Sequence, residues 1–381
     1  MKILYVCNEY PPAPYGGIGI FVKTLAENLV RSDIQCVVVG LYDQIKKYSV
    51  ESSNGVEVRR ARKKNWLLGK IHPVFQLTLE RFQLSREVYK IERTANPDLI
   101  ESYDWTGPLF RKPRSPVIVR LHGSNSANEI YEGKKPSKFL YFWERRNLRF
   151  ADYIISVSKF MMHATNESFK VNNLRTAVIN NFFDHKVFYL NISISRNSTK
   201  IIFVGKFHER KGVFELFQIL NHLLPLNEEY FFEFVGNHTM DQKSKLLAFL
   251  DSSIQSRVTF TGVLPHEKLP GVYNSATLMI MPSRAEAFGL TAVEAMACGC
   301  IVAMANRATG PELITDGIDG ILINADDAKE SAIKLHKYLS DNNILERLRN
   351  GALEKSQCFS KDKILPQNIA FYKSIIARDE V

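Results

Sequence analysis

The stretch KILYVCNEYPPAPYGGIGIFVKTLAENLV, residues 2–30, contains the unit from which the rest of the fold is predicted. Residues 2–7 form a short apolar run, typical of a strand that is buried on both faces of a sheet. A loop rich in turn formers follows and contains Gly16 and Gly17. Apolar side chains then recur at helical spacing, at Ile18, Phe21, Val22, Leu25, Ala26, Leu29 and Val30. This pattern predicts a strand, a glycine loop and an amphipathic helix in a parallel α/β sheet.

The same alternation continues along the chain and is interrupted once. Further apolar runs occur at 35–40, 98–102, 116–121, 153–158 and 176–180, and they predict the remaining strands of a first sheet. The polar, aperiodic segment 189–199 is predicted to be a linker. The pattern then restarts with runs at 200–205, 231–236, 257–262, 277–282, 300–305 and 320–323. We therefore predict two Rossmann-like, doubly wound α/β domains that face each other across a cleft, at residues 1–188 and 200–358. Residues 359–381 are predicted to form a C-terminal helix that can pack back on the first domain.

Composition restricts the class of protein. The chain has 381 residues, of which 45% are hydrophobic and 24% charged, with a formal net charge of +10. Five scattered cysteines without metal-ligand spacing favour free thiols in a reducing compartment. The opening residues lack the long apolar run of a signal peptide, and no later segment resembles a membrane span. We expect a cytoplasmic protein. Nucleic acid is the weakest of the anionic partners because no nucleic-acid-binding motif is present.

A second stretch, SRAEAFGLTAVEAMACGC at 283–300, places two glutamates in an apolar neighbourhood. Pro282 ends the preceding strand, and a helix is predicted to begin near Thr291, after the loop that contains Gly289. Free N–H groups at such a helix start suit phosphate. Carboxylates at Glu286 and Glu294 suit sugar hydroxyls, so the pattern fits a nucleotide sugar. The alternative for Glu294 is a capping box with Thr291.

Positive charge follows the first strand of the second domain. Lys206 and Lys211 lie in one predicted β-to-α turn, within FVGKFHERKG at 203–212, and together they predict an anion site. The alternative for each is a solvated surface charge. His122 follows a predicted strand of the first domain and points at the cleft, unless it is a hydrogen-bonded structural residue.

Over nearly its whole length the sequence resembles the retaining glycosyltransferases of family 4, which have the two-domain GT-B fold. The most specific motif is Glu, seven residues, Glu followed by AMACG, at 286–299. Further matching segments are 11–29, HG at 122–123, ADYIISVSKFM at 151–161, 203–212 and GILI at 320–323.

The resemblance implies a role for each matched residue. Glu286 and the backbone that follows it, at Phe288, Gly289, Leu290 and Thr291, hold the donor sugar, and Glu294 holds the ribose hydroxyls. Lys206 and Lys211 neutralise the diphosphate. Gly16 and Gly17 let the backbone approach the phosphates and the acceptor, and His122 forms a hydrogen bond with the transferred sugar. The catalytic set is thus Glu286, Lys211, Lys206 and His122.

The sequence departs from the family pattern at four places. Lys206 replaces the usual arginine, Phe182 a glycine, Ile301 a common proline, and Ala308-Thr309 a glycine pair. These changes leave the charge pattern intact, although lysine loses the two-pronged hydrogen bonding of arginine.

The expected function is transfer of a hexose-type sugar from a nucleotide diphosphate donor to a glycan or lipid-linked acceptor, with retention of configuration. We expect no cofactor and no metal, since the chain contains no Asp-x-Asp motif. Cell-surface polysaccharide or glycolipid biosynthesis is the expected setting. Two alternatives stay open at this point, namely a nucleotide-sugar epimerase on the same scaffold and a non-catalytic sugar-nucleotide-binding protein.

A basic run suggests a contact with the membrane. RRARKKNWLLGK at 59–70 contains six basic residues around Trp66. We expect it to bind an anionic membrane at the cytoplasmic face, through Arg59, Arg60, Arg62, Lys63, Lys64 and Trp66. The helix predicted after it has two apolar stripes, one with Phe75 and Phe82 and one with Leu84 and Val88. The alternative is a helix covered on both sides within the domain.

Overall fold

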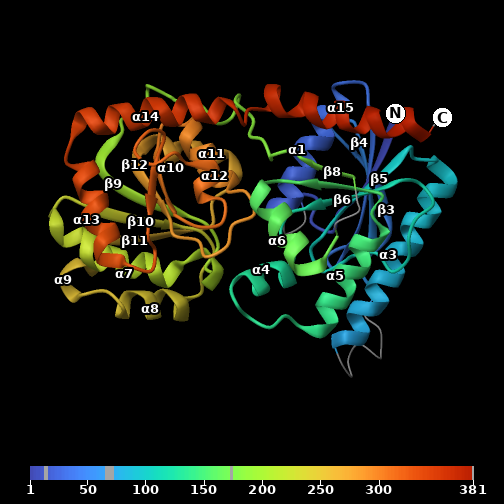
Figure 1. Ribbon diagram of the computed structural model, residues 1–381, viewed down its shortest axis with the longest axis horizontal. Coiled ribbons are helices and arrows are strands. Elements are labelled where there is room, and N and C mark those ends of the chain that lie inside the picture. Colours follow the sequence, from blue (N-terminus) through green and yellow to red (C-terminus); the bar gives the residue numbers. More distant parts are fainter. Residues whose placement is uncertain (13–15, 65–72, 172–174, 380–381) are drawn as a thin grey trace. The chain divides into compact units, whose positions relative to one another are not determined.

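The computed structural model describes residues 1–12, 16–64, 73–171 and 175–379 (Figure 1). The chain divides into two compact units, and each contains its own sheet. The first unit comprises Met1–Asn181 together with Ile364–Val381, and the second comprises Phe182–Lys363. The predicted fold class, two doubly wound α/β domains, is therefore confirmed. The second sheet begins at Asn197, inside the segment predicted to be a linker.

The first unit has an eight-stranded sheet in the order β3-β4-β2-β1-β5-β6-β7-β8. All neighbouring strands are parallel except the β3–β4 hairpin, which is antiparallel. The strands are β1 Lys2–Val6, β2 Gln35–Tyr42, β3 Ser49–Ser53, β4 Val56–Arg62, β5 Leu99–Tyr103, β6 Val117–Leu121, β7 Tyr153–Ser156 and β8 Arg175–Val178. The helices are α1 Gly17–Val30, α3 Pro73–Ala95, α4 Asn125–Tyr131, α5 Lys138–Phe150, α6 Lys159–Phe169 and α15 Lys361–Asp379.

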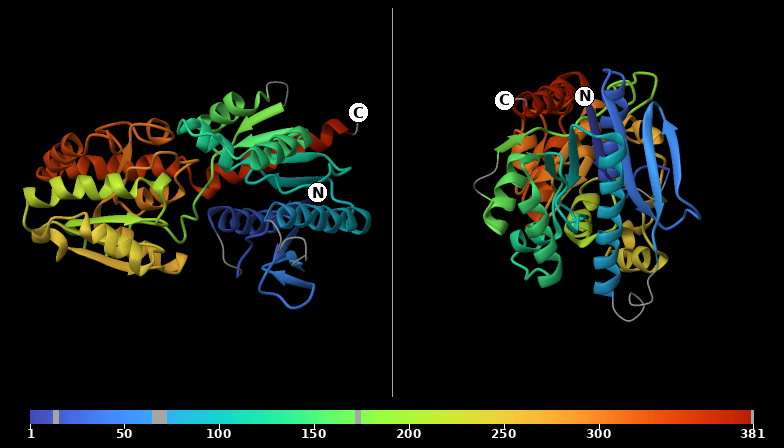
Figure 2. Two further views of the ribbon diagram at one scale, coloured as in Figure 1. Left: turned by 90° about the horizontal axis from the view of Figure 1, so that it is seen from below. Right: turned by 90° about the vertical axis from the view of Figure 1, so that its right-hand side faces the viewer.

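Helices cover both faces of this sheet (Figures 1 and 2). On one face, Leu84, Val88 and Ile91 of α3 pack against apolar side chains of β1, β2, β4 and β5. On the other face, Tyr372 of α15 contacts Tyr5 of β1, and α1 packs nearby. Burial on both faces explains why the central strands are continuous apolar runs.

The second unit has a six-stranded, wholly parallel sheet in the order β11-β10-β9-β12-β13-β14. The strands are β9 Asn197–Val204, β10 Phe231–Val235, β11 Val258–Gly262, β12 Ala276–Met281, β13 Ile301–Ala305 and β14 Ile321–Ile323. The α-helices are α7 Val213–Leu223, α8 Met240–Ala248, α9 Ser252–Gln255, α10 Leu269–Ser275, α11 Leu290–Ala297, α12 Gly310–Leu313, α13 Ala328–Leu339 and α14 Asn342–Gln357. Short 3₁₀ turns occur at η1 Glu209–Lys211, η2 Leu224–Leu226 and η3 His266–Lys268.

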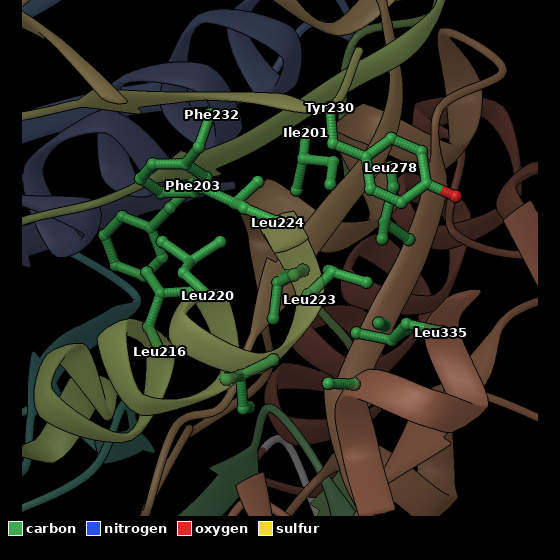
Figure 3. Packing of buried hydrophobic residues seen from close by; sticks show 14 of the residues in the cluster. Ile201, Phe203, Leu216, Leu220, Leu223, Leu224, Tyr230, Phe232, Leu278 and Leu335 are labelled. Atoms are coloured by element: carbon green, nitrogen blue, oxygen red, sulfur yellow. The ribbon is translucent and has the colours of Figure 1, made fainter. Parts of the chain in front are cut away.

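The core of the second unit lies between this sheet and α7 (Figure 3). Leu216, Leu220 and Leu223 follow one another on one side of α7, and Phe203 and Phe232 of the sheet face them. All five side chains are buried. The three leucines on one stripe of α7 thus hold this helix against the sheet. The loop between β9 and α7 is held at both of its ends as a result.

In both sheets the strand order reverses beside the first strand of the unit. From β9 the chain continues to β10 and β11 on one side, and then returns to β12 on the other. From β1 it continues to β2, β3 and β4 on one side, and then returns to β5 on the other. At such a point the loops after two neighbouring parallel strands diverge, which leaves room for a ligand at the carboxyl edge of the sheet.

The basic run predicted to bind a membrane lies partly in strand β4, which the sequence pattern did not reveal. Arg60 points inward and is buried, so its assignment to a membrane contact was wrong. Its guanidinium donates to the carbonyl of Tyr10 and pairs with Glu51 at 2.7 Å. Lys63 pairs with two acids, whereas Arg62 and Lys64 are exposed. Trp66 lies outside the described residues.

Helix α3 shows which of its two apolar stripes faces the sheet. The stripe with Leu84 and Val88 is buried, whereas Phe75, Phe82 and Tyr89 are 51%, 49% and 37% exposed. The alternative of a helix covered on both sides was therefore wrong. None of the described helices is both long enough and apolar enough to cross a membrane.

A buried polar cluster joins α15 to the sheet of the first unit. Arg120 of β6 pairs with Glu101 of β5 at 2.7 Å, and these side chains are 1% and 4% exposed. Asn368 and Tyr372 of α15 accept hydrogen bonds from the same guanidinium, and the Tyr372 hydroxyl donates to Glu101. The charge of Arg120 is thus balanced by Glu101 of the neighbouring strand, and α15 supplies neutral hydrogen-bond acceptors for the same guanidinium.

Replacing Glu101 by Ala should lower the free energy of unfolding by about 3–5 kcal/mol, because it leaves the Arg120 charge buried without its counter-ion. Urea denaturation followed by circular dichroism measures this change. The control is Asp241→Ala, which removes an exposed ion pair with Lys245 and should cost less than about 1 kcal/mol. Equal effects of the two substitutions would contradict the structural role of the buried pair.

Candidate functional site

Two loops meet at the strand-order reversal of the second sheet, one after β9 and one after β12. Gly212 has φ +68°, and a Cβ placed on it would lie 2.0 Å from the carbonyl oxygen of Pro282. Only glycine permits this approach. The Arg284 N–H also donates to the carbonyl of Arg210 at 2.8 Å, so the two loops are joined by backbone as well as by packing.

This junction brings together two of the predicted catalytic side chains. Lys211 Nζ lies 2.5 Å from Glu286 Oε2, and the side chains are 30% and 13% exposed. The neighbouring pair, Arg284 with Glu215, has a separation of 2.6 Å. Lys206, in contrast, is exposed and makes no ion pair with any residue that the structure describes. The loop therefore offers one paired and one solvated cation.

Helix α11 begins at Leu290, next to this pair. Its N-cap is Gly289 with φ +91°, and no side chain caps the helix. The N–H groups of Leu290 and Thr291 precede the first bonds of the helix and are available to an anion. Phe288 is buried, with its ring 5.5 Å from that of Phe359, which holds the residue before the cap in place.

Glu294 lies on the buried side of α11, and its partners exclude the capping box considered from the sequence. The carboxylate contacts His266 Nε2 at 2.9 Å and the Tyr273 hydroxyl at 3.5 Å. Thr291 contacts the sulfur of Met281 instead of capping the helix. Glu294 is only 2% exposed, so its partners fix its orientation closely.

His266 and Tyr273 are candidate site residues that sequence reasoning missed. His266 is in η3, in the segment after β11, and its ring lies 5.0 Å from that of Phe188. Its position after the carboxyl end of a parallel strand was the available signal. Tyr273 is in α10 and gave no such signal, because its contact with Glu294 depends on the packing of α10 beside α11.

The first unit has a corresponding arrangement around β1. The Gly16 N–H donates to Glu9 Oε2 at 3.0 Å, so this part of the loop is held by a carboxylate. A Cβ on Gly17 would meet nothing within 4 Å, and the backbone there is open to approach. Residues 13–15 of the same loop lie outside the described part of the chain.

His122 is positioned by an acid that the sequence analysis did not single out. Asp104, directly after β5, accepts hydrogen bonds from the N–H groups of His122 at 2.9 Å and Gly123 at 3.1 Å. The His122 ring packs edge-on against Phe21 of α1, with 5.2 Å between the ring centroids. The helix after the glycine loop and the turn after β6 therefore contact each other directly.

Burial controls the protonation of both residues. It lowers the pKa of His122 to about 3, and the Arg120 charge acts in the same direction. Burial raises the pKa of Asp104 to about 7, although the hydrogen bond from the His122 backbone opposes this change. His122 is thus a neutral imidazole near pH 7, able to donate one hydrogen bond and to accept another.

The candidate residues form one set in each unit. The second unit groups Lys211, Glu286 and Glu294 with the start of α11, at the carboxyl ends of β9 and β12. The first unit groups the glycine loop and His122 with Asp104.

Comparison with known proteins now decides the family. A model of group 1 glycosyl transferases matches residues 191–355, and a model of glycosyltransferase family 4 matches residues 15–187. Together they span most of the chain. The chain belongs to the family 4 glycosyltransferases. An uncharacterised glycosyltransferase of Methanocaldococcus jannaschii is 26% identical, over 98% of both chains.

Solved structures confirm that this glycosyltransferase has the GT-B fold. Sucrose-phosphate synthase from Thermosynechococcus elongatus matches with a TM-score of 0.84 at 19% identity, covering 99% of this chain and 100% of that one. The Anabaena protein HepE, solved in complex with UDP-glucose, matches with a TM-score of 0.74 at 20% identity, covering 98% and 100%. At these identities the likeness establishes the fold alone.

The low pKa of His122 should make the glycosyltransferase less stable in acid. Because the unfolded chain binds a proton near pH 6.5 and the folded chain only near pH 3, stability is lost as the pH falls between these values. Asp104 affects folding stability in the opposite direction, because its raised pKa makes the folded chain less stable as the pH rises from about 4 to about 7. Comparison with a variant at His122 therefore separates the two contributions.

Urea unfolding of the wild type and His122→Asn at pH 5 and pH 7.5 isolates the His122 contribution. The stability advantage of the wild type over the variant should be smaller at pH 5. An advantage that is the same at both pH values would show an ordinary histidine pKa.

Proposed function

We propose that this glycosyltransferase moves a hexose from a nucleotide diphosphate sugar to a glycan or lipid-linked acceptor, with retention of configuration and without a metal. The observation that carries the proposal is the junction of Lys211, Glu286 and the uncapped start of α11 at the strand-order reversal of the second sheet. It combines a cation, free N–H groups and a carboxylate, which are the groups that a sugar diphosphate needs.

The second unit binds the donor in this proposal. The diphosphate accepts hydrogen bonds from the N–H groups of Leu290 and Thr291 and from the ammonium groups of Lys211 and Lys206. Glu286 accepts hydrogen bonds from hydroxyls of the hexose, and Glu294 accepts them from hydroxyls of the ribose. The contact with His266 keeps the Glu294 carboxylate oriented. The complex of HepE with UDP-glucose supports UDP as the first nucleotide to test.

The reaction breaks the bond between the anomeric carbon and the diphosphate oxygen, and forms a bond from that carbon to the acceptor oxygen. Negative charge develops on the departing diphosphate, which takes the proton of the acceptor hydroxyl. Lys211 stabilises that charge, and the pairing with Glu286 holds its ammonium in place beforehand. No protein nucleophile is invoked, and the absence of a metal from the reaction remains a prediction.

The first unit serves the acceptor side in this proposal. His122, neutral and oriented by Asp104, can hydrogen-bond the transferred sugar, and the open backbone at Gly17 admits a substrate. Arg62 and Lys64, with the exposed aromatic side chains of Phe75, Phe82 and Tyr89 on α3, support contact with an anionic membrane at its cytoplasmic face. Polysaccharide or glycolipid synthesis is the setting that we propose.

Nucleotide binding tests the donor site. UDP, GDP, ADP and dTDP should be compared by thermal shift on the wild type and on Glu294→Gln, which keeps the shape of the buried side chain. We expect one nucleotide to raise the melting temperature of the wild type, and the variant to lose most of that rise. Glu346→Gln, an exposed substitution on α14, should keep it. No shift with any nucleotide would contradict the proposed function.

Turnover tests Lys211 separately. Lys211→Ala should lower the rate of nucleotide release from the donor by about 100- to 1000-fold, because a pre-organised group that stabilises the transition state is removed. The control is Lys245→Ala, which removes an exposed ion pair on α8. Unchanged unfolding curves would show that both variants fold. A Lys211→Ala rate close to that of the wild type would exclude this residue from catalysis.

A further inference from the structure

The first unit contains a basic groove that takes no part in the proposed sugar transfer, although it includes Arg62 and Lys64, the two cations proposed above to contact a membrane. It lies between the β3–β4 side of the sheet and α3, and encloses a volume of about 510 Å³. Six cationic side chains line it and a single carboxylate, Glu87, opposes them; the cations are Lys46, Lys47, Arg59, Arg62, Lys64 and Lys90. A volume of this size lies within the range of small-molecule sites.

Half of these cations are not neutralised by neighbouring acids. Arg59 pairs with Glu57 at 2.5 Å, and Lys90 pairs with Glu87 at 2.8 Å. Within the described part of the chain, Lys46, Lys47 and Arg62 make no ion pair, and all three are exposed. Lys63, the neighbour of Arg62, shows the contrast, since its ammonium lies 3.0 Å from Glu80.

The wall of the groove is held rigid by a buried amide. Gln83 of α3 is 8% exposed, and its two ends bind the backbone on either side of Lys63. Its Nε2 donates to the carbonyl of Arg62 at 2.7 Å, and its Oε1 accepts from the N–H of Lys64 at 3.2 Å. The end of β4 is therefore fixed to α3, so Arg62 and Lys64 are presented from a backbone that is held in place before binding.

We propose that this groove binds a phosphate-bearing ligand with two or more negative charges, at a site separate from the donor site in the second unit. Arg62 offers the two-pronged donor geometry that phosphate oxygens match, and Lys46 and Lys47 add point charges beside it. The exposed Tyr48 hydroxyl supplies a further donor at the same wall. A concave site with convergent cations suits a discrete headgroup or small molecule rather than a flat surface.

Calorimetric titration of the full chain with inorganic pyrophosphate tests the site. Because pyrophosphate also suits Lys206 and Lys211, the titration is repeated on Lys206→Ala/Lys211→Ala, in which the groove should still bind. In that background, Lys46→Gln/Lys47→Gln/Arg62→Gln should weaken binding at least tenfold. Binding should also weaken as the NaCl concentration rises, since the cations are exposed.

The matched control is Lys135→Gln/Lys138→Gln/Arg145→Gln, which removes the same number of exposed charges at and before α5 of the same unit. It should bind pyrophosphate as its parent does. Equal loss in both triple variants would show a general charge effect and overturn the proposal, as would undiminished binding in the groove variant. Thermal melting without ligand should show that both variants fold.

Vesicles of phosphatidylcholine with phosphatidic acid identify the source of the phosphate. Sedimentation with these vesicles that pyrophosphate reverses assigns the groove to a lipid headgroup, whereas pyrophosphate binding without sedimentation assigns it to a soluble phosphate compound. Both outcomes support the site. Sedimentation that neither pyrophosphate nor the groove variant reduces would overturn it. The nucleotide shift of the second unit is independent of all these measurements, so failure of either proposal can be recognised separately.

Discussion

The reversal of strand order beside the first strand of each sheet is the constraint on which the remaining structure depends. In the second unit it makes β9 and β12 neighbours although more than seventy residues separate them in the chain. Because both strands are parallel, their carboxyl ends share one edge, so the two loops start side by side before the chain leads them to opposite sides of β9. Gly212 permits the closest approach between these loops, and Lys211 and Glu286 are brought into contact as a consequence.

Apart from Lys206, the charged candidate residues at these edges have partners within the described part of the chain. Lys211 is paired with Glu286, Glu294 with His266, and Asp104 with two backbone N–H groups. Partly buried carboxylates without such partners would be costly. These partners keep the side chains oriented before a substrate binds, and substrate groups can then replace them. Charged groups that are oriented in advance lower a reaction barrier because they need not reorganise in the transition state. The neutral state of His122 follows from the same burial.

Sequence patterns predicted those elements correctly for which one physical property, such as burial on both faces, determines the sequence. Buried parallel strands must be apolar on both faces, so the runs at 2–7, 200–205 and 277–282 correspond to β1, β9 and β12. The apolar pattern did not indicate the β3–β4 hairpin, because β4 contains RRAR and its inward Arg60 is stabilised by the Tyr10 carbonyl and Glu51. A buried arginine and a solvated one look the same in a sequence.

The sequence by itself determined the fold class, the family and the positions of the motifs, because periodicity and motif spacing are local properties of the chain. Only the tertiary structure decided which residues are partners. Glu294 contacts His266 and Tyr273 rather than the cap of its own helix, and Asp104 holds the backbone of His122. It also decided that α3 exposes Phe75 and buries Leu84. These outcomes depend on which strands become neighbours, and strand neighbours are fixed by long-range packing, on which local spacing carries no information.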